Sequence, residues 1–172
     1  MAEKTKGVEV LPYNPVWKTE FNRIKEQLLT YVGDLIIGIE HVGSTSIEGL
    51  SAKPIIDIDL VMESYEVLPE IIERLQQYGY EHQGNLGIEG REAFRRSEND
   101  RFMNYHLYVC PKNGKGYVEH IAFRDYLRSN TVARLEYEAV KLQLAEQYRH
   151  DIDAYGEGKT AIVTSILEKA MN

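Results

Sequence analysis

The sequence predicts an α/β (α+β) fold in which helices flank a mixed sheet and the C-terminal third of the chain is helical. In the first two thirds, short Ile- and Val-rich runs alternate with apolar side chains at helical spacing. From about residue 117 onward, the apolar pattern is helical throughout. The chain has 172 residues, a common length for one domain. We therefore expect residues 1–172 to form a single domain whose helical C-terminal part starts at about 117.

The first elements are a helix and a strand. Trp17, Phe21 and Leu28 lie at helical spacing and predict a helix over residues 14–32. The short, Ile-rich run at residues 35–42 predicts a buried strand that leads into a Gly-Ser turn.

The middle of the chain contains three more expected strands. One covers residues 55–62, and a helix over residues 65–78 follows it. A Gly-rich loop at residues 84–90 then leads into a strand pair at residues 93–97 and 104–110. We expect residues 98–100 to form the turn between the paired strands.

The remaining residues predict three helices. The first two cover residues 117–128 and 131–148. The third begins at Tyr155 or Lys159 and ends near residue 170.

Charge and composition narrow the class of function. Lys plus Arg number 20 against 27 Asp plus Glu, so the formal net charge is −7, which makes long nucleic acid an unlikely partner. No run approaches the length of a membrane span, so we expect no membrane interaction. The single cysteine, Cys110, fits a reducing compartment, and residues 1–7 lack the apolar run of a signal peptide. We therefore expect a cytoplasmic protein.

Two carboxylates on one expected strand indicate a metal site. Asp57 and Asp59 lie two residues apart, so both side chains point to the same face of the strand. Their charges repel at this spacing, and a divalent cation removes the repulsion. Mg²⁺ (or Mn²⁺) commonly binds one or two carboxylates together with substrate phosphates. The alternative is a strand face that is simply solvated.

The turn before this strand indicates a phosphate site. Gly43 allows a ligand to approach the backbone closely, while Ser44 and Thr45 supply hydroxyl groups and N–H groups at the start of a helical turn. Lys53 lies beside the turn in sequence and could neutralise a bound phosphate. The alternative is an ordinary strand-to-helix turn with a serine cap. The turn and the Asp-x-Asp strand together predict a phosphate cradle next to a metal site.

These residues resemble a known family. Gly43-Ser44 followed by Asp57-x-Asp59 is similar to the signature of the polymerase-β-type nucleotidyltransferase superfamily. The longer stretch at residues 41–59 resembles the GrpB (UPF0157) family, and the resemblance extends over about residues 8–170. It implies a nucleotidyltransferase-like α/β fold with a mixed sheet, but it implies no known substrate.

One departure from the superfamily concerns the third carboxylate, which is usually on a later strand. The expected strand at residues 104–110 has no acidic residue. His106 on this strand could replace the acid as a metal ligand or act as a base. Glu119 and His120 are other candidates, and a hydrogen-bonded structural histidine is the alternative for His106.

Several basic residues fit a phosphate site. Arg91 follows the Gly-rich loop and could bind a phosphate through two parallel hydrogen bonds, or it could be a surface arginine. The resemblance makes Lys159 a candidate triphosphate contact, because C-terminal helices often close over the nucleotide in nucleotidyltransferases. Arg124 and Arg128 lie four residues apart and favour ion pairs at the surface or between helices.

Together these features predict a Mg²⁺-dependent nucleotidyltransferase. It would transfer a nucleoside monophosphate from a nucleoside triphosphate to an unknown acceptor, with Asp57, Asp59 and His106 as the catalytic residues. One alternative is a catalytically inactive module that binds a nucleotide and serves regulation, which the missing third acid favours. The other is a structural or interaction domain that keeps the motif for folding.

Overall fold

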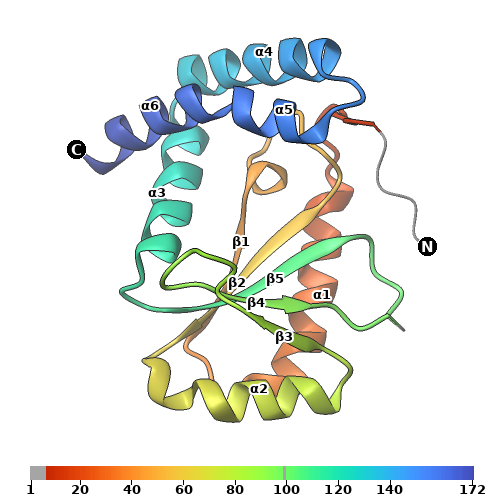
Figure 1. The fold of residues 1–172 in the computed structure, drawn as a ribbon, viewed down its shortest axis with the longest axis vertical. Coiled ribbons are helices and arrows are strands. Elements are labelled where there is room, and N and C mark those ends of the chain that lie inside the picture. Colours follow the sequence, from red (N-terminus) through yellow and green to blue (C-terminus); the bar gives the residue numbers. More distant parts are fainter. Residues whose placement is uncertain (1–6, 99) are drawn as a thin grey trace.

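The structure is a computed structural model that describes residues 7–98 and 100–172. Residues 1–6 of the N-terminal segment and Asn99 of the expected turn lie outside the described residues. Helices surround a central sheet, and the C-terminal helices lie across one end of it (Figure 1). In the described part of the chain, no helix is both long and apolar enough to cross a membrane.

A five-stranded mixed sheet forms the centre, in the order β1-β2-β5-β4-β3. Its strands are β1 (Gly38–Val42), β2 (Ile56–Met62), β3 (Glu81–Gly84), β4 (Glu92–Arg95) and β5 (Tyr105–Pro111). The β2–β5 pair is parallel, and the other neighbouring pairs are antiparallel. The structure thus confirms the expected α/β class with a mixed sheet.

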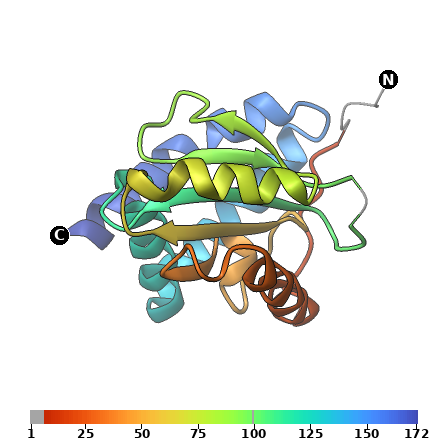
Figure 2. The same ribbon diagram turned by 90° about the horizontal axis from the view of Figure 1, so that it is seen from below.

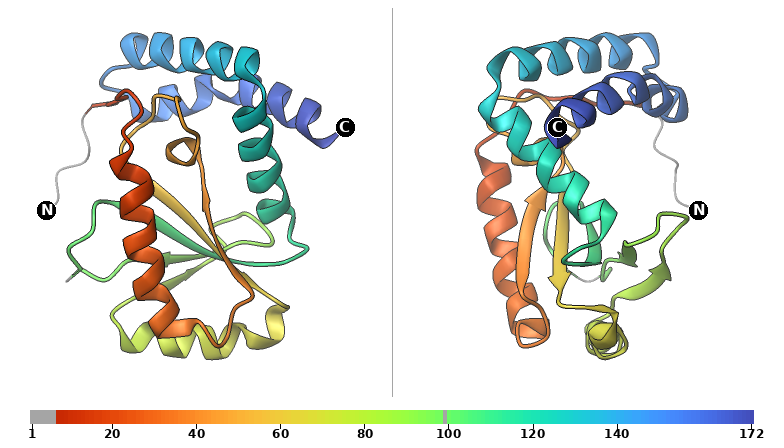
Figure 3. Two further views of the ribbon diagram at one scale, coloured as in Figure 1. Left: turned by 180° about the vertical axis from the view of Figure 1, so that it is seen from behind. Right: turned by 90° about the vertical axis from the view of Figure 1, so that its left-hand side faces the viewer.

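The helices lie on both sides of the sheet and at one end. They are α1 (Val16–Val32), α2 (Leu68–Gln77), α3 (Lys115–Ser129), α4 (Thr131–Gln147), α5 (Ile152–Gly158) and α6 (Thr160–Met171), with short 3₁₀ helices η1 (Ser44–Ser46) and η2 (Tyr65–Val67). Seen from below, α2 lies across the sheet, with α1 beside it (Figure 2). Helix α3 lies on the side away from α1, and α4, α5 and α6 cross the end near η1 (Figure 3).

Two hydrophobic clusters hold these layers together. In the larger one, Ile56, Ile58 and Leu60 of β2 are fully buried together with Ile24 and Leu28 of α1. Burying an aliphatic side chain of this size contributes about 1.5–3 kcal/mol.

The second cluster joins the C-terminal helices to the loop after β1. It consists of Ile47, Leu50, Leu127, Ala133, Tyr137 and Ile166. These residues come from the loop, α3, α4 and α6, so the cluster fixes the loop beneath the C-terminal helices.

The expected elements differ from the observed ones in three places. Strand β3 was not expected, because its alternate positions are polar or glycine and its outer edge is unpaired. The helix expected from Tyr155 or Lys159 onward is two helices, α5 and α6. The helix expected at residues 65–78 is η2 followed by α2, because Pro69 in the first turn of α2 lacks an N–H group.

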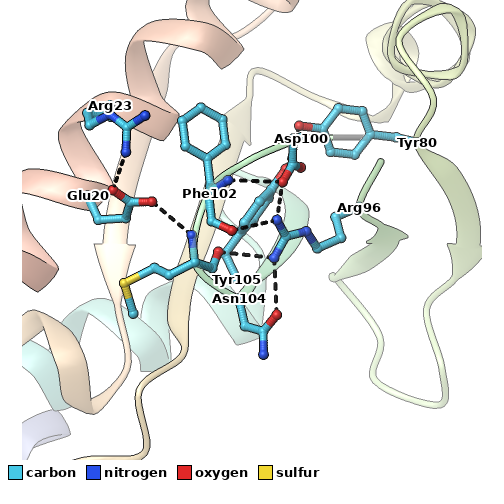
Figure 4. Close-up of polar contacts among 9 residues, drawn as sticks. Glu20, Arg23, Tyr80, Arg96, Asp100, Phe102, Asn104 and Tyr105 are labelled. Atoms are coloured by element: carbon cyan, nitrogen blue, oxygen red, sulfur yellow. Dashed lines mark hydrogen bonds and ion pairs between the residues drawn. The ribbon is translucent and has the colours of Figure 1, made fainter. Parts of the chain in front are cut away.

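A network of polar contacts fixes the loop between β4 and β5 (Figure 4). Asp100 pairs with Arg96 and accepts a hydrogen bond of 2.8 Å from the Tyr105 hydroxyl. The Met103 N–H donates to Glu20 of α1 at 2.8 Å. These contacts tie the loop to α1 and set where β5 begins, one residue before His106.

Candidate functional site

Polar side chains gather on the face of β2 opposite the large hydrophobic cluster. In the parallel β2–β5 pair, Asp57 lies beside His106 and Asp59 lies beside Tyr108. Residues that are opposite each other in neighbouring strands share a face of the sheet. Both aspartates therefore lie on one face together with His106, as the two-residue spacing predicted.

Asp57 is held by the histidine beside it. Its Oδ1 lies 2.8 Å from Nδ1 of His106, and its side chain is 30% exposed. An ionised carboxylate only accepts hydrogen bonds, so Nδ1 of His106 donates the proton. The Nε2 atom of the neutral ring is then left as an acceptor, on a side chain that is 55% exposed.

Asp59 is completely buried and also pairs with a histidine. Its Oδ2 lies 2.7 Å from Nδ1 of His120 on α3, whereas its Oδ1 has no partner among the described residues. Burial raises the pKa of Asp59, and the His120 hydrogen bond opposes this effect only in part. Burial would lower the pKa of His120, but the hydrogen bond and the charges of Asp59 and Asp57 raise it overall.

The turn after β1 packs tightly against Asp57. Gly43 has φ +77°, and a Cβ atom added there would overlap Oδ2 of Asp57. The turn therefore requires glycine both for its backbone conformation and for its close approach to the carboxylate. Ser44 follows directly as the first residue of η1, so its position is set relative to Asp57.

A buried hydrogen-bond network supports this turn. The Thr45 hydroxyl donates to the Ile55 carbonyl at 3.1 Å, and it lies 3.0 Å from Nε2 of His41. Because the hydroxyl proton is directed to Ile55, Nε2 of His41 donates to Thr45. The His41 ring stacks on Phe21 with centroids 4.7 Å apart, and burial lowers its pKa to about 4.

A pocket of about 210 Å³ opens between the turn and the C-terminal helices, and we call it the lysine pocket. Its lining residues are Ser44, Thr45, Lys53, Ile55, Asp57, His106, Lys141, Tyr155 and Lys159. The three lysines come from the loop before β2, from α4 and from the junction of α5 and α6. Three lysine side chains thus line a small space that Asp57 and His106 also line.

Burial changes the protonation of two of these lysines. Lys141 is 1% exposed and donates from Nζ to the Ser51 carbonyl at 2.8 Å. Burial, together with the charges of Lys159 and Lys53, lowers the pKa of Lys141 to about 7, against the opposing effect of Glu138. Burial and Lys53 lower the pKa of Lys159 to about 8. An anion in the pocket would favour the charged form of both groups.

The structure brings most of the expected site residues together. Ser44, Thr45, Lys53, Asp57, His106 and Lys159 all line the lysine pocket, and Gly43 and Asp59 adjoin Asp57. Arg91 does not line this pocket. Its guanidinium lies over the Tyr108 ring, 4.3 Å from the centroid, and its buried Nε has no partner among the described residues.

Sequence reasoning did not assign two residues of the site, and it named His120 only as another candidate for the role of the third acid. Lys141 and Tyr155 line the lysine pocket, and His120 holds Asp59. A signal for Lys141 exists, because Tyr137-x-x-x-Lys141 repeats the spacing of Tyr155-x-x-x-Lys159. That spacing places ring and ammonium one helical turn apart, as the 5.2 Å and 4.6 Å contacts confirm.

The donor set fits a divalent cation that is held partly by protein. Asp59 has a buried carboxylate oxygen with no partner, and Asp57 lies two residues away on the same face. Among the described residues, no group of three or more His, Cys, Asp or Glu side chains is arranged to hold a metal ion. Two carboxylates are sufficient for Mg²⁺, whose remaining ligands are commonly water and substrate phosphates.

Comparison with known proteins identifies the family. The family described as GrpB protein matches residues 7–169. The chain belongs to the GrpB family. Its relative YqkA of Bacillus subtilis is 38% identical over 164 residues, and the alignment covers 95% of this chain and 47% of YqkA. The glutamate-rich protein GrpB of Alkalihalophilus pseudofirmus is 36% identical over 94% of this chain and 95% of that protein.

Solved structures confirm the fold of this GrpB-family chain. The conserved protein GrpB from Enterococcus faecalis superposes with a TM-score of 0.79 at 30% identity, covering 95% of this chain and 100% of that one. Cid1 in complex with the UTP analogue UMPNPP gives a TM-score of 0.54 at 15% identity, covering 80% of this chain and 41% of Cid1. At that identity the likeness shows the fold alone. The expected nucleotidyltransferase-like fold is therefore confirmed.

Proposed function

We propose that this chain is a Mg²⁺-dependent nucleotidyltransferase, which transfers a nucleoside monophosphate from a nucleoside triphosphate to an acceptor hydroxyl. One observation carries the proposal: Asp57 and Asp59 share a face of β2, the buried Oδ1 of Asp59 has no partner, and Asp57 also lines the lysine pocket. A metal held by the two carboxylates would therefore lie beside the space that suits a polyphosphate.

The residues of the lysine pocket suit the triphosphate tail. Ser44 offers a hydroxyl group at the start of η1, and Lys53, Lys141 and Lys159 offer positive charge around it. A pocket of about 210 Å³ is too small for a whole nucleotide, so only the phosphates would enter it. A Mg²⁺ held by Asp57 and Asp59 would offset the negative charge of the phosphates, including the charge that develops during transfer.

In this proposal His106 acts as the base. Asp57 holds its Nδ1 proton, so its exposed Nε2 can accept the proton of the acceptor hydroxyl. The hydroxyl oxygen then forms a bond to the α-phosphorus, and the bond between that phosphorus and the bridging oxygen to the β-phosphorus breaks. Pyrophosphate leaves and takes the bridging oxygen with it.

The proposal is tested by nucleotide binding with and without Mg²⁺. We expect nucleoside triphosphates to raise the melting temperature of the wild type only when Mg²⁺ is present. A ligand at 100 times its dissociation constant adds about 2.7 kcal/mol of stability, which is readily measured. Asp57→Asn should abolish the shift. Asp153→Asn, the same chemical change at an exposed position on α5, serves as the control and should keep it.

The outcomes separate the proposal from its alternatives. Tight Mg²⁺-dependent binding to Asp57→Asn would contradict the proposed site. Binding without pyrophosphate release across a panel of acceptors would favour an inactive nucleotide-binding module. The absence of a carboxylate on β5 favours that second candidate, because His106 stands beside Asp57 there.

A further inference from the structure

A second, larger cavity lies beside the η1 turn. It measures about 620 Å³ and is lined by residues of α1, α3 and β1, so we call it the α1–α3 groove. Thr45 lines both this groove and the lysine pocket, so the two cavities share a wall. The volume lies within the range of about 300–1,000 Å³ that is usual for small-molecule sites.

The lining of the groove is positively charged, whereas the chain as a whole has a negative net charge. Its cationic lining residues are Lys18, Lys25, Arg124, Arg128 and Arg134. Among the residues that the structure describes, two carboxylates line it, those of Glu40 and Glu48. The lining residues thus carry an excess of three positive charges, in a chain with a formal net charge of −7. A concentration of positive charge in an acidic protein favours an anionic ligand.

The two arginines of α3 differ in how their charge is balanced. Arg124 is paired with Glu40 at 2.9 Å, so its charge is compensated. Arg128 donates from Nε and Nη2 to the neutral carbonyl of Ser46, at 3.1 and 2.8 Å. These bonds fix the guanidinium without neutralising it.

The cations on the other parts of the wall are also uncompensated. Lys18 and Lys25 of α1 form no ion pair with any residue in the ranges 7–98 and 100–172. Arg134 at the start of α4 donates to the Leu127 carbonyl at 2.9 Å, which is again neutral. Within the described part of the chain, the groove therefore has four cationic side chains whose charges are not balanced by direct ion pairing.

We propose that the α1–α3 groove binds a phosphomonoester of about nucleotide size, with its phosphate held by Lys18, Lys25 and Arg128. A phosphomonoester carries a charge of about −1.5 to −2 at neutral pH, which matches several cations better than a single carboxylate does. Arginine also offers phosphate a fork of parallel donors.

The role of this ligand rests on the proposed function: it is the acceptor. Glu40, which lines the groove, stands opposite Asp59 in the β1–β2 pair, so the groove borders the face of the two aspartates at the edge strand β1. The triphosphate in the lysine pocket and the acceptor in the groove would then approach the aspartates from two sides of η1.

Calorimetry with ribose 5-phosphate in Mg²⁺-free buffer tests the groove. We expect binding at one site, and ribose without the phosphate should not bind. The double variant Lys18→Gln/Lys25→Gln should weaken binding at least about tenfold, equivalent to about 1.4 kcal/mol. Lys169→Gln at the exposed end of α6 removes a like charge elsewhere and should have no effect.

The single tryptophan provides a local readout. Tyr13, which lines the groove, packs edge-on against Trp17 with ring centroids 5.6 Å apart. Binding in the groove should therefore change the Trp17 emission.

Three results would overturn the proposal. The first is that the wild type does not bind ribose 5-phosphate at millimolar concentration. The second is that Lys169→Gln weakens binding as much as Lys18→Gln/Lys25→Gln does. The third is that Lys159→Gln abolishes binding while Lys18→Gln/Lys25→Gln keeps it. The last result would place the phosphate in the lysine pocket and leave the proposed function intact. If the nucleotide test fails while ribose 5-phosphate still binds in the groove, only the catalytic role is lost.

Discussion

The contact between Gly43 and Asp57 couples the Gly-Ser turn to the carboxylate pair. Gly43→Ala has two effects. The alanine strains the backbone because φ is +77°, and its Cβ displaces the Asp57 carboxylate because it would overlap Oδ2. We expect it to lower the free energy of unfolding by about 2 kcal/mol or more. Urea unfolding measures the change.

Gly87→Ala is the matched control for this prediction. Gly87 has φ +85°, but no atom lies within 4 Å of its added Cβ. It should therefore show only the backbone cost, of about 1 kcal/mol. Equal losses in the two variants would show that the contact with Asp57 contributes nothing.

His41 makes stability depend on pH. Its pKa in the folded protein is lowered to about 4 by burial, whereas an unfolded histidine titrates near 6.5. The unfolded state therefore binds a proton first, and stability falls as pH decreases through this window, by about 3 kcal/mol in total. His41→Gln should flatten the curve of unfolding free energy between about pH 4 and pH 6.5. Parallel curves for the two proteins would contradict the assignment.

At the scale of elements, the lysine pocket depends on three segments that meet only in the fold. Lys53 lies in the loop before β2, Lys141 on α4 and Lys159 at the start of α6. With pKa values lowered to about 7 and about 8, Lys141 and Lys159 lose their charge as pH rises. The affinity for inorganic triphosphate should then fall about tenfold per pH unit for each lysine that must take up a proton.

Calorimetry between about pH 6.5 and pH 9 checks this prediction. The double variant Lys141→Met/Lys159→Gln is the comparison, because it removes both titrating groups and should bind weakly with little of this dependence. If the wild type and the double variant had the same affinity for inorganic triphosphate across the whole pH range, these lysines would not contact the phosphates.

Local patterns predicted the elements whose periodicity is strong. The alternation of Ile56, Asp57, Ile58 and Asp59 predicted β2 and the face of both carboxylates, and both follow from the two-residue period of a strand. Strand β3 was missed because it is short and polar at the edge of the sheet. Strand β3 is stabilised by its pairing with β4, which no local sequence pattern predicts.

The parts of the site that are close in sequence were predicted from their spacing, whereas His106 and Lys159 were named as single candidates and their contact with these parts comes from the fold. Gly43 of the Gly-Ser turn and Asp57 of the Asp pair are only 14 positions apart, so the motif can be recognised from the sequence alone. Lys141 and His120 reach the site through the packing of α3 and α4 over the loop after β1. That packing depends on buried contacts distant in sequence, which periodicity does not specify.

At the scale of the whole molecule, the net charge of −7 limits the size of an anionic partner. Eight of the 20 Lys and Arg residues line the groove or the lysine pocket, so the rest of the chain is strongly acidic and only a short anion avoids repulsion from it. A single-stranded RNA of about 30 nucleotides should therefore bind no more tightly than a mononucleotide at about 0.15 M salt. A fluorescence-anisotropy titration measures this, and tight binding of the long RNA would contradict the charge argument.

The parallel pairing of β2 with β5 also has a kinetic consequence. Asp57 and His106 are 49 residues apart, and β3 and β4 lie between them in the chain. Closing a contact of this sequence separation costs chain entropy before any pairing energy is gained, so it slows folding. We therefore expect the face that carries both aspartates and the centre of the sheet to be completed late in folding, in the same step.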